Sequence, residues 1–236
     1  MGLFSNLFGK KNSPPPAPPG TPVEQRHSSI PLNTYKPPEN STFVSPTSSG
    51  ILNLKKNDIL DLSKVSPNLQ RIRVAAGWDV NTGYGADYDL DLCAFLLDEY
   101  NRPVRNVVNP VYYGNKRSTG IYLDGDNLTG EGDGDDENIF VTLEKLPQAV
   151  KRIVFNVVIY QASSRGQCFG KVRNAYVRIV DEYNGGRELC RFNLSDDGGN
   201  SPAVVFAELY KDNGAWNFRA IGEYTNGSIQ SLFKKY

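Results

Sequence analysis

Histidine and cysteine are scarce in this chain of 236 residues. His27 is the one histidine, and the three cysteines Cys93, Cys168 and Cys190 form no Cys-Xaa-Xaa-Cys pair. These shortages argue against a zinc site and against catalysis that depends on paired histidines. An odd number of widely spaced cysteines is typical of a reducing compartment, so we predict a cytoplasmic location.

Long apolar runs and an excess of charge are also missing. No stretch of the sequence reaches the roughly 18 apolar residues that a membrane-spanning helix needs. The 26 Lys and Arg residues balance the 26 Asp and Glu residues. A general nucleic-acid binder normally carries a basic surplus, so we predict no nucleic-acid partner.

Residues 1–50 hold 10 of the 15 prolines. Proline lacks the amide donor used in helices and sheets, and this stretch has little apolar surface to offset the entropy of ordering. We therefore predict a disordered Pro- and Ser-rich tail over residues 1–50 and a folded domain over residues 51–236. The run from Pro14 to Pro19 is a candidate ligand for SH3-like protein partners.

The extreme N-terminus has a different character. Leu3, Phe4, Leu7 and Phe8 have helical spacing and are followed by two lysines. A segment of this kind suits weak contact with a membrane surface or with a partner groove. The alternative is a frayed terminus.

From Ile51 onward, short β-branched and aromatic runs are separated by turns. Alternation with a period of two predicts strands with one buried and one solvent-facing side. Turns at residues 184–186 and 212–214 contain Asn and Gly and predict hairpins. Helical patterns are short, at Leu143–Ala149 and near Ile229–Lys235. These features predict an all-β fold, an antiparallel β-sandwich with short helices. The strand candidates are residues 150–160, 176–182, 189–194, 204–210 and 216–222.

The acidic residues are concentrated in one part of the sequence. From Asp79 to Glu137 there are 13 acidic and 4 basic residues, a net charge of −9. Asp87, Asp89 and Asp91 alternate, so they would lie on one face if their segment is a strand. Residues 124–137 include seven acids and four glycines, and the glycines allow the backbone to curl around a cation.

Oxygen donors on a flexible loop favour Ca²⁺, which takes six to eight oxygen ligands at about 2.3 to 2.6 Å. Mg²⁺ is the weaker candidate because it demands stricter octahedral geometry. The loop is not an EF-hand, since Leu128, Thr129 and Asp135 stand at the fifth, sixth and twelfth positions counted from Asp124. The alternative is an acidic loop that is simply solvated.

Several motifs together resemble the tellurium-resistance TerD family, and the resemblance extends over roughly residues 51–236. The motifs are Gly77-Trp78-Asp79, residues 85–91, residues 125–137, residues 165–176 and Ala207-Glu208-Leu209-Tyr210. The resemblance implies a calcium-binding β-sandwich that serves in stress response or resistance to damaging agents, without an established catalytic activity.

The resemblance also implies which residues bind the metal. Two Ca²⁺ ions close together are expected, because one ion could not use all of the acids. The predicted ligands are Asp87, Asp89, Asp126, Glu131, Asp133, Asp135, Asp136 and Glu137. Second choices are Asp79, Asp91, Asp124 and the carbonyl of Gly130, and Asp91 could instead be a structural acid that faces inward.

The Pro-rich extension resembles a cyclic-AMP-binding branch of the family from slime moulds, which makes cyclic AMP a second candidate ligand. Arg165, Lys171 and Arg173, interleaved with glycines, would supply the phosphate donors. The alternative is that these basic residues simply face water. Paired carboxylates also serve in glycosidases, but no nucleophile–base arrangement is visible, so we predict that the chain is not an enzyme.

Overall fold

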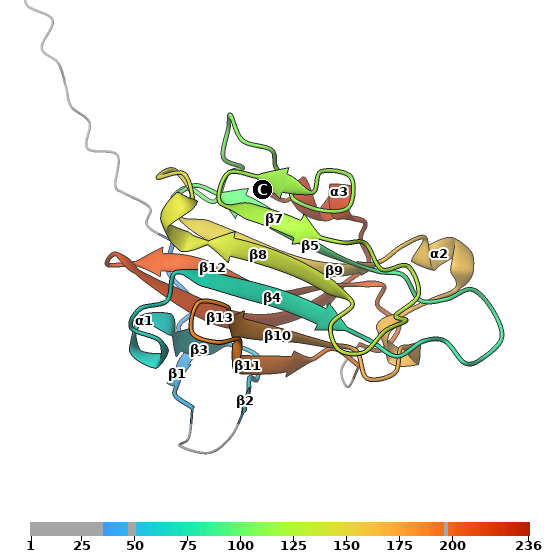
Figure 1. The fold of residues 1–236 in the computed structure, drawn as a ribbon. Helices are drawn as coiled ribbons and strands as arrows, with labels where there is room; N and C mark the ends of the chain where they lie inside the picture. Colours follow the sequence, from blue (N-terminus) through green and yellow to red (C-terminus); the bar gives the residue numbers. More distant parts are fainter. Residues whose placement is uncertain (1–34, 47–50, 196–197) are drawn as a thin grey trace, which may run out of the picture. The chain divides into compact units, whose positions relative to one another are not determined.

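The computed structural model describes residues 35–46, 51–195 and 198–236, which form two β-sheets packed face to face (Figure 1). The six-stranded sheet has the order β1 (Thr42–Val44), β3 (Asp58–Asp61), β13 (Ala215–Thr225), β12 (Ala203–Asp212), β9 (Arg152–Ile159) and β5 (Leu90–Leu97). The seven-stranded sheet has the order β2 (Leu52–Asn53), β11 (Arg187–Asn193), β10 (Tyr176–Asp181), β4 (Arg71–Gly77), β8 (Glu137–Thr142), β7 (Ile121–Asp124) and β6 (Arg117–Ser118).

The helices are short, as the sequence predicts. They are α1 (Leu62–Val65), α2 (Ala162–Arg165), α3 (Ile229–Phe233) and the 3-10 turns η1 (Leu143–Lys145) and η2 (Phe169–Lys171). The predicted antiparallel sandwich is confirmed, although β1–β3 and β2–β11 are parallel pairs. None of the helices in the described ranges has the length and apolar character needed to cross a membrane.

The two predicted hairpins are present. Asn213 and Gly214 join β12 to β13 with φ angles of 47° and 86°. Two positive φ values in a two-residue loop match the right-handed twist of the flanking strands, and Asn and Gly are the residues that adopt them most readily. The Gly185–Gly186 turn likewise joins β10 to β11.

The main core lies between the sheets, where Val74 and Leu92 pack with the stacked rings of Phe155 and Phe206. A second apolar cluster covers the outer face of the six-stranded sheet and includes Leu232 of α3. Because of this cover, all of β9 and the first eight residues of β12 are buried. The expectation of a solvent-facing side for residues 204–210 is therefore wrong, because α3 and Tyr35 cover that side.

The fold includes part of the predicted tail. Residues 35–46 lie against the six-stranded sheet, and β1 pairs with β3. The remaining predictions for the tail fall on Pro14–Pro19 and on the apolar segment from Leu3 to Phe8, which lie outside the described residues.

Candidate metal centre

The two acidic segments meet at one end of the sandwich, where the loops after β4 and β7 lie close to α2 (Figure 1). Backbone contacts hold these loops together. The N–H of Asp136 donates to the Ala76 carbonyl at 2.8 Å, and the N–H of Trp78 donates to the Asp136 carboxylate at 2.9 Å. The antiparallel pairing of β4 with β8 brings this about, since Ala76 lies opposite Glu137 at the end of both strands.

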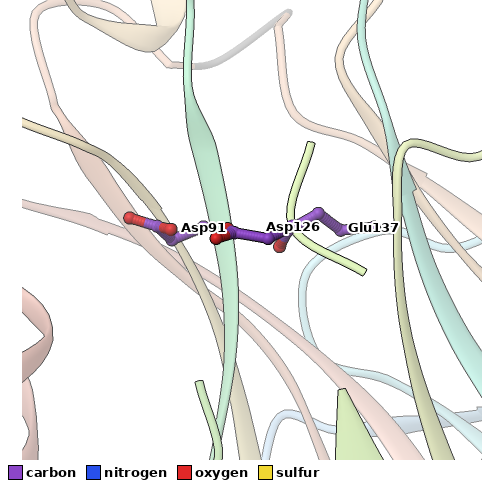
Figure 2. A group of neighbouring side chains, drawn as sticks. All are labelled: Asp91, Asp126 and Glu137. Carbon is purple, nitrogen blue, oxygen red and sulfur yellow. The ribbon is translucent and has the colours of Figure 1, made fainter. Parts of the chain in front are cut away.

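Among the residues that the structure describes, one group of three acids places its oxygens close enough to share an ion. Asp91 of β5, Asp126 of the β7–β8 loop and Glu137 of β8 each offer a carboxylate oxygen within 4.8 Å of the other two (Figure 2). Asp91 is 4% exposed and Glu137 is 1% exposed, whereas Asp126 is exposed. The group thus spans both sheets and the acidic loop.

Within the described ranges, neither buried acid of this group forms an ion pair with a basic side chain. Burial, together with the neighbouring carboxylates of Asp89 and Asp126, raises the pKa of Asp91 to about 8. Burial also raises the pKa of Glu137 well above its ordinary value, although the N–H of Leu92 donates to it at 2.5 Å. No donor in the described part of the chain hydrogen-bonds the Asp91 carboxylate.

This donor set fits a hard cation. Oxygens bound to one Ca²⁺ at about 2.3 to 2.6 Å lie at most about 5 Å apart, which the observed spacing satisfies. A buried carboxylate is stable in its charged form only beside a cation or several donors. The nearest basic group to Asp126 is 3.8 Å away, on Lys116, which is 42% exposed and contacts neither buried acid.

Without metal, the buried carboxyl of Asp91 makes stability depend on pH. Its folded pKa of about 8 lies above the unfolded value of about 3.9, so the folded state binds more protons between these values. In EDTA the free energy of unfolding should therefore fall as pH rises from 5 to 8, by at most about 1.4 kcal/mol per pH unit. Urea titrations of the wild type and of Asp91→Asn at these pH values measure the free energy of unfolding. If this free energy depends on pH equally in both proteins, the prediction is contradicted.

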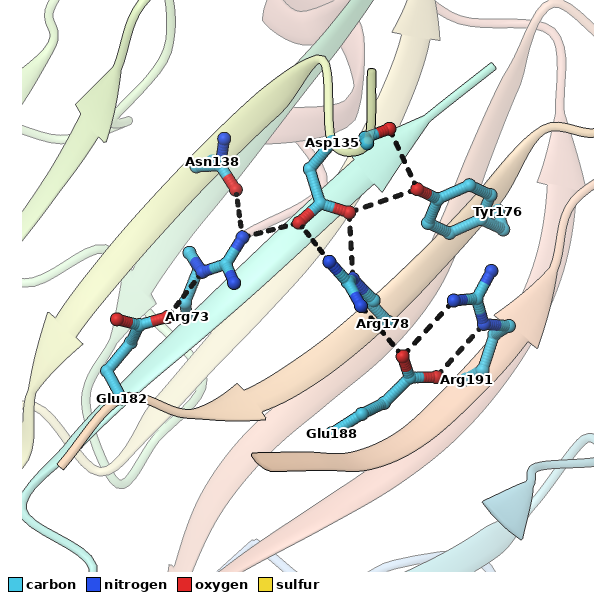
Figure 3. A network of polar contacts seen from close by, with 9 residues as sticks. Arg73, Asp135, Asn138, Tyr176, Arg178, Glu182, Glu188 and Arg191 are labelled. Atoms are coloured by element: carbon cyan, nitrogen blue, oxygen red, sulfur yellow. Dashed lines mark hydrogen bonds and ion pairs between the residues drawn. The ribbon is translucent and has the colours of Figure 1, made fainter. Parts of the chain in front are cut away.

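Asp135, a predicted ligand, lies in a different environment. Its carboxylate accepts from Nε and Nη2 of Arg178 at 2.8 and 2.7 Å and from the Tyr176 hydroxyl at 3.0 Å, and it also contacts Arg73 (Figure 3). Burial would raise the pKa of Asp135, but these contacts lower it below its usual value. Asp135 therefore anchors the acidic loop to β4 and β10, and the structure does not bring it to the three-acid group.

The ion-pair network around Asp135 extends across the seven-stranded sheet. Arg178 also binds Glu188 at 2.9 Å, Glu188 binds Arg191 at 3.0 Å, and Arg73 binds Glu182 (Figure 3). The sequence did not predict this network, because the partners of Asp135 lie 62 and 43 positions away along the chain.

Asp136 is held between the two loops. Its carboxylate accepts from the Trp78 N–H and from Asn127 Nδ2, both at 2.9 Å. Burial raises its pKa, with further contributions from Asp135 and Asp79. Asp79, Asp133 and Asp136 line a cavity of about 490 Å³ together with Arg191, so three acidic side chains and one basic side chain border this second place.

The other predicted ligands are distributed around these two places. Asp89 is buried beside the three-acid group and raises the pKa of Asp91. Asp87 is exposed because β5 begins only at Leu90, so the three alternating acids do not share one strand. Glu131 is exposed on the loop. Asp91, a second choice from the sequence, is thus the central residue, and its alternation with Asp89 was the signal for it.

The predicted phosphate-binding residues are not gathered around one cavity. Lys171 lines a cavity of about 810 Å³ together with Asp91, but its Nζ already donates to the Gly166 carbonyl at 2.8 Å. Arg165 and Arg173 do not line this cavity. Arg165 lies over the ring of Tyr160, 5.4 Å from its centroid, and Arg173 is exposed.

Two packed sheets with a cluster of three carboxylates at one end define this chain as an all-β protein with a candidate site of oxygen donors. The TerD domain model matches residues 51–236, and the chain belongs to the TerD family.

The relatives of this chain include proteins named for tellurium resistance and for stress response. It is 43% identical over 188 residues to uncharacterized protein YceE of Bacillus subtilis, with 78% of this chain and 97% of YceE covered. Tellurium resistance protein TerD of Alcaligenes is 40% identical over 187 residues, with 78% and 96% covered. General stress protein 16U of Bacillus subtilis is 39% identical over 189 residues, with 78% and 96% covered. The family thus includes proteins named for tellurium resistance and for stress response.

A solved structure supports the same fold. The crystal structure of a homologue of telluride resistance protein TerD from Streptomyces coelicolor A3(2) matches with a TM-score of 0.60 and 25% sequence identity. The match covers 70% of this chain and 96% of that chain.

Proposed function

We propose that this chain is a non-enzymatic calcium-binding protein that acts in stress response, and that Asp91, Asp126 and Glu137 hold a Ca²⁺ ion. One observation carries the proposal: two buried carboxylates and a third from the β7–β8 loop converge within 4.8 Å, and among the described residues no basic group pairs with either buried acid. A divalent cation would satisfy all three at once, since its charge offsets their mutual repulsion.

The donor chemistry selects the ion. All three side chains are carboxylates, and the described part of the chain places no cysteine or histidine in the group. Oxygen-only donors suit Ca²⁺ or Mg²⁺, and the softer transition metals prefer nitrogen or sulfur. Ca²⁺ is favoured over Mg²⁺ because it accepts irregular geometry from a Gly-rich loop and can take both oxygens of a carboxylate.

A second ion would lie at the cavity formed by Asp79, Asp133 and Asp136. Asp136 is already hydrogen-bonded to the Trp78 N–H and to Asn127, so this place offers fewer free lone pairs than the three-acid group. We therefore expect weaker binding there, filled after the first site during a calcium titration.

Binding would act on the fold itself. Asp91 belongs to the six-stranded sheet, Glu137 to the seven-stranded sheet and Asp126 to the loop between β7 and β8. An ion bound by all three would link both sheets and the loop, so metal would order one end of the sandwich. A ligand that binds only the folded state stabilises it by mass action, and this is how calcium would be sensed.

A second candidate function is cyclic-AMP binding in the 810 Å³ cavity that Lys171 lines. Its volume lies within the range of about 300 to 1,000 Å³ common for small-ligand sites, and a lysine suits a phosphate. Calorimetry with cyclic AMP should then show saturable heat. Lys171→Ala should lower the affinity for cyclic AMP by about tenfold or more, because it removes one charged contact. Absence of heat with the wild type, with and without calcium, would remove this candidate.

A further inference from the structure

A buried ion triad lies on the outer face of the six-stranded sheet, far from the acidic loops in sequence. Glu208 of β12 is fully buried, and Arg152 of β9 and Arg219 of β13 are 7% and 5% exposed. Glu208 contacts Nε of Arg152 and accepts from Nε of Arg219 at 2.7 Å. One carboxylate with two guanidinium groups leaves a net positive charge and spare N–H donors that need partners.

Tyr35 fills the space above this triad. Its hydroxyl donates to the Glu208 carboxylate and accepts from Nη2 of Arg219 at 3.0 Å. Its ring faces the Arg152 guanidinium, with 4.3 Å from Cζ to the ring centroid, and meets the edge of Tyr210 at 5.5 Å between centroids. These contacts recognise a phenol, because a phenylalanine ring would keep the stacking and lose both hydrogen bonds.

The segment that carries Tyr35 makes a second anchor further along. Thr42, Phe43 and Val44 pair in parallel with β3, and the Thr42 N–H donates to the Asn57 carbonyl at 3.1 Å. Asn57 also accepts from Nη1 of Arg219 at 3.0 Å through its side chain, so the two anchors share a neighbour. The tyrosine therefore binds the outer face of the six-stranded sheet, and the short strand extends the edge of the same sheet beside β3.

The triad lies within the part of the chain that the family model matches, and the segment bound to it does not. Arg152, Glu208 and Arg219 lie inside the family match over residues 51–236, whereas Tyr35 and β1 precede it. The relatives are covered almost completely, at 96% to 97% of their length, by 78% of this chain. The triad thus belongs to the shared domain, and the segment bound to it belongs to the extension.

We propose that this triad is a recognition site for an extended segment that carries an unmodified tyrosine seven residues before a short strand, and that residues 35–46 of this chain are its ligand, bound in cis. Glu208 requires a hydroxyl that donates a proton, so the site accepts tyrosine. A phosphate on the tyrosine would remove the hydroxyl that donates to Glu208 and would place about two negative charges beside this buried carboxylate, with which Arg152 and Arg219 are already paired, so the site rejects phosphotyrosine. The extension is thereby bound to the outer face of the six-stranded sheet.

Hydrogen exchange on the full chain tests the docking. Tyr35→Ala should speed exchange of the amides in residues 40–46 by about tenfold or more, because loss of the tyrosine anchor frees the strand beside β3. Tyr84→Ala is the matched control, since Tyr84 is fully exposed, and it should leave that segment unchanged. Equal exchange in the wild type and in Tyr35→Ala would overturn the proposal.

Binding in trans tests the recognition. A fluorescent peptide of residues 35–46 should bind saturably to a full-length Tyr35→Ala, Thr42→Pro variant, in which the cis segment has lost both anchors. Peptides with phenylalanine or phosphotyrosine at position 35 should bind about tenfold or more weakly, the loss of at least one charge-assisted hydrogen bond. If circular dichroism shows a folded variant and the three peptides bind equally or not at all, the recognition is wrong. If the variant does not fold, the exchange comparison decides.

Discussion

Calcium should raise the melting temperature of the wild-type protein by about 5 to 10 °C when its free concentration is about 100 times the dissociation constant. Mass action at this ratio adds about 2.7 kcal/mol, and each kcal/mol shifts the midpoint of a domain of this size by about 2 to 4 °C. The physical cause is the relief of repulsion among Asp91, Asp126 and Glu137, which lie within 4.8 Å of one another. Thermal scans in EDTA and in graded calcium measure the shift.

Variants of single acids test which residues cause the calcium-dependent rise in melting temperature. Asp91→Asn and Glu137→Gln keep the shape of each side chain and remove one charge, so each should abolish most of the calcium-dependent rise. In EDTA the same variants should be at least as stable as the wild type at pH 8, because they remove an uncompensated buried charge. Glu131→Gln is the control, since Glu131 is an exposed acid of the same loop. A rise that survives in both buried variants, or that never occurs in the wild type, would reject the proposed site.

Asp135→Asn should lower the free energy of unfolding by about 2 to 4 kcal/mol, in EDTA and in calcium alike. The change removes one partner from a nearly buried ion pair and leaves the Arg73 and Arg178 guanidinium groups facing each other without the charge between them. The side chain of Asp135 is 3% exposed, so water cannot replace the lost contacts. The loop would lose its attachment to β10, while the three-acid group would keep its ligands.

Urea denaturation of Asp135→Asn at pH 7 measures this loss, and calcium titration of the same variant measures the metal site. Glu131→Gln is the matched control in the same loop, because Glu131 is exposed and makes no ion pair among the described residues. The outcome that contradicts the assignment is unchanged stability in EDTA together with a lost response to calcium, since Asp135 would then be a ligand, as the sequence predicts.

The two predictions separate the roles of neighbouring acids in one loop. A variant at Asp91 or Glu137 should remove the response to calcium without lowering stability in EDTA, and a variant at Asp135 should lower stability and keep the response to calcium. The Tyr35 site lies on the outer face of the six-stranded sheet and involves none of these acids. Its tests are therefore independent of whether the chain binds calcium.

Much of the fold follows from local sequence. Each predicted strand over residues 150–222 is present, and the Asn213–Gly214 turn joins β12 to β13. These features depend on side chains a few positions apart, through period-two burial and the backbone preferences of Asn and Gly. The concentration of acids between Asp79 and Glu137, and hence the preference for a hard cation, is likewise a property of composition alone.

Which of those acids lies at the metal site and which pairs with arginine was decided only by the tertiary structure. The start of β5 at Leu90 leaves Asp87 exposed and turns Asp91 toward Glu137, which comes from the other sheet. Asp135 faces Arg73 and Arg178, and Tyr35 meets Glu208 173 positions away. A carboxylate binds metal, pairs with arginine or accepts from a phenol according to what faces it. Local sequence determines which groups are available, but the packing of distant strands determines what each one faces.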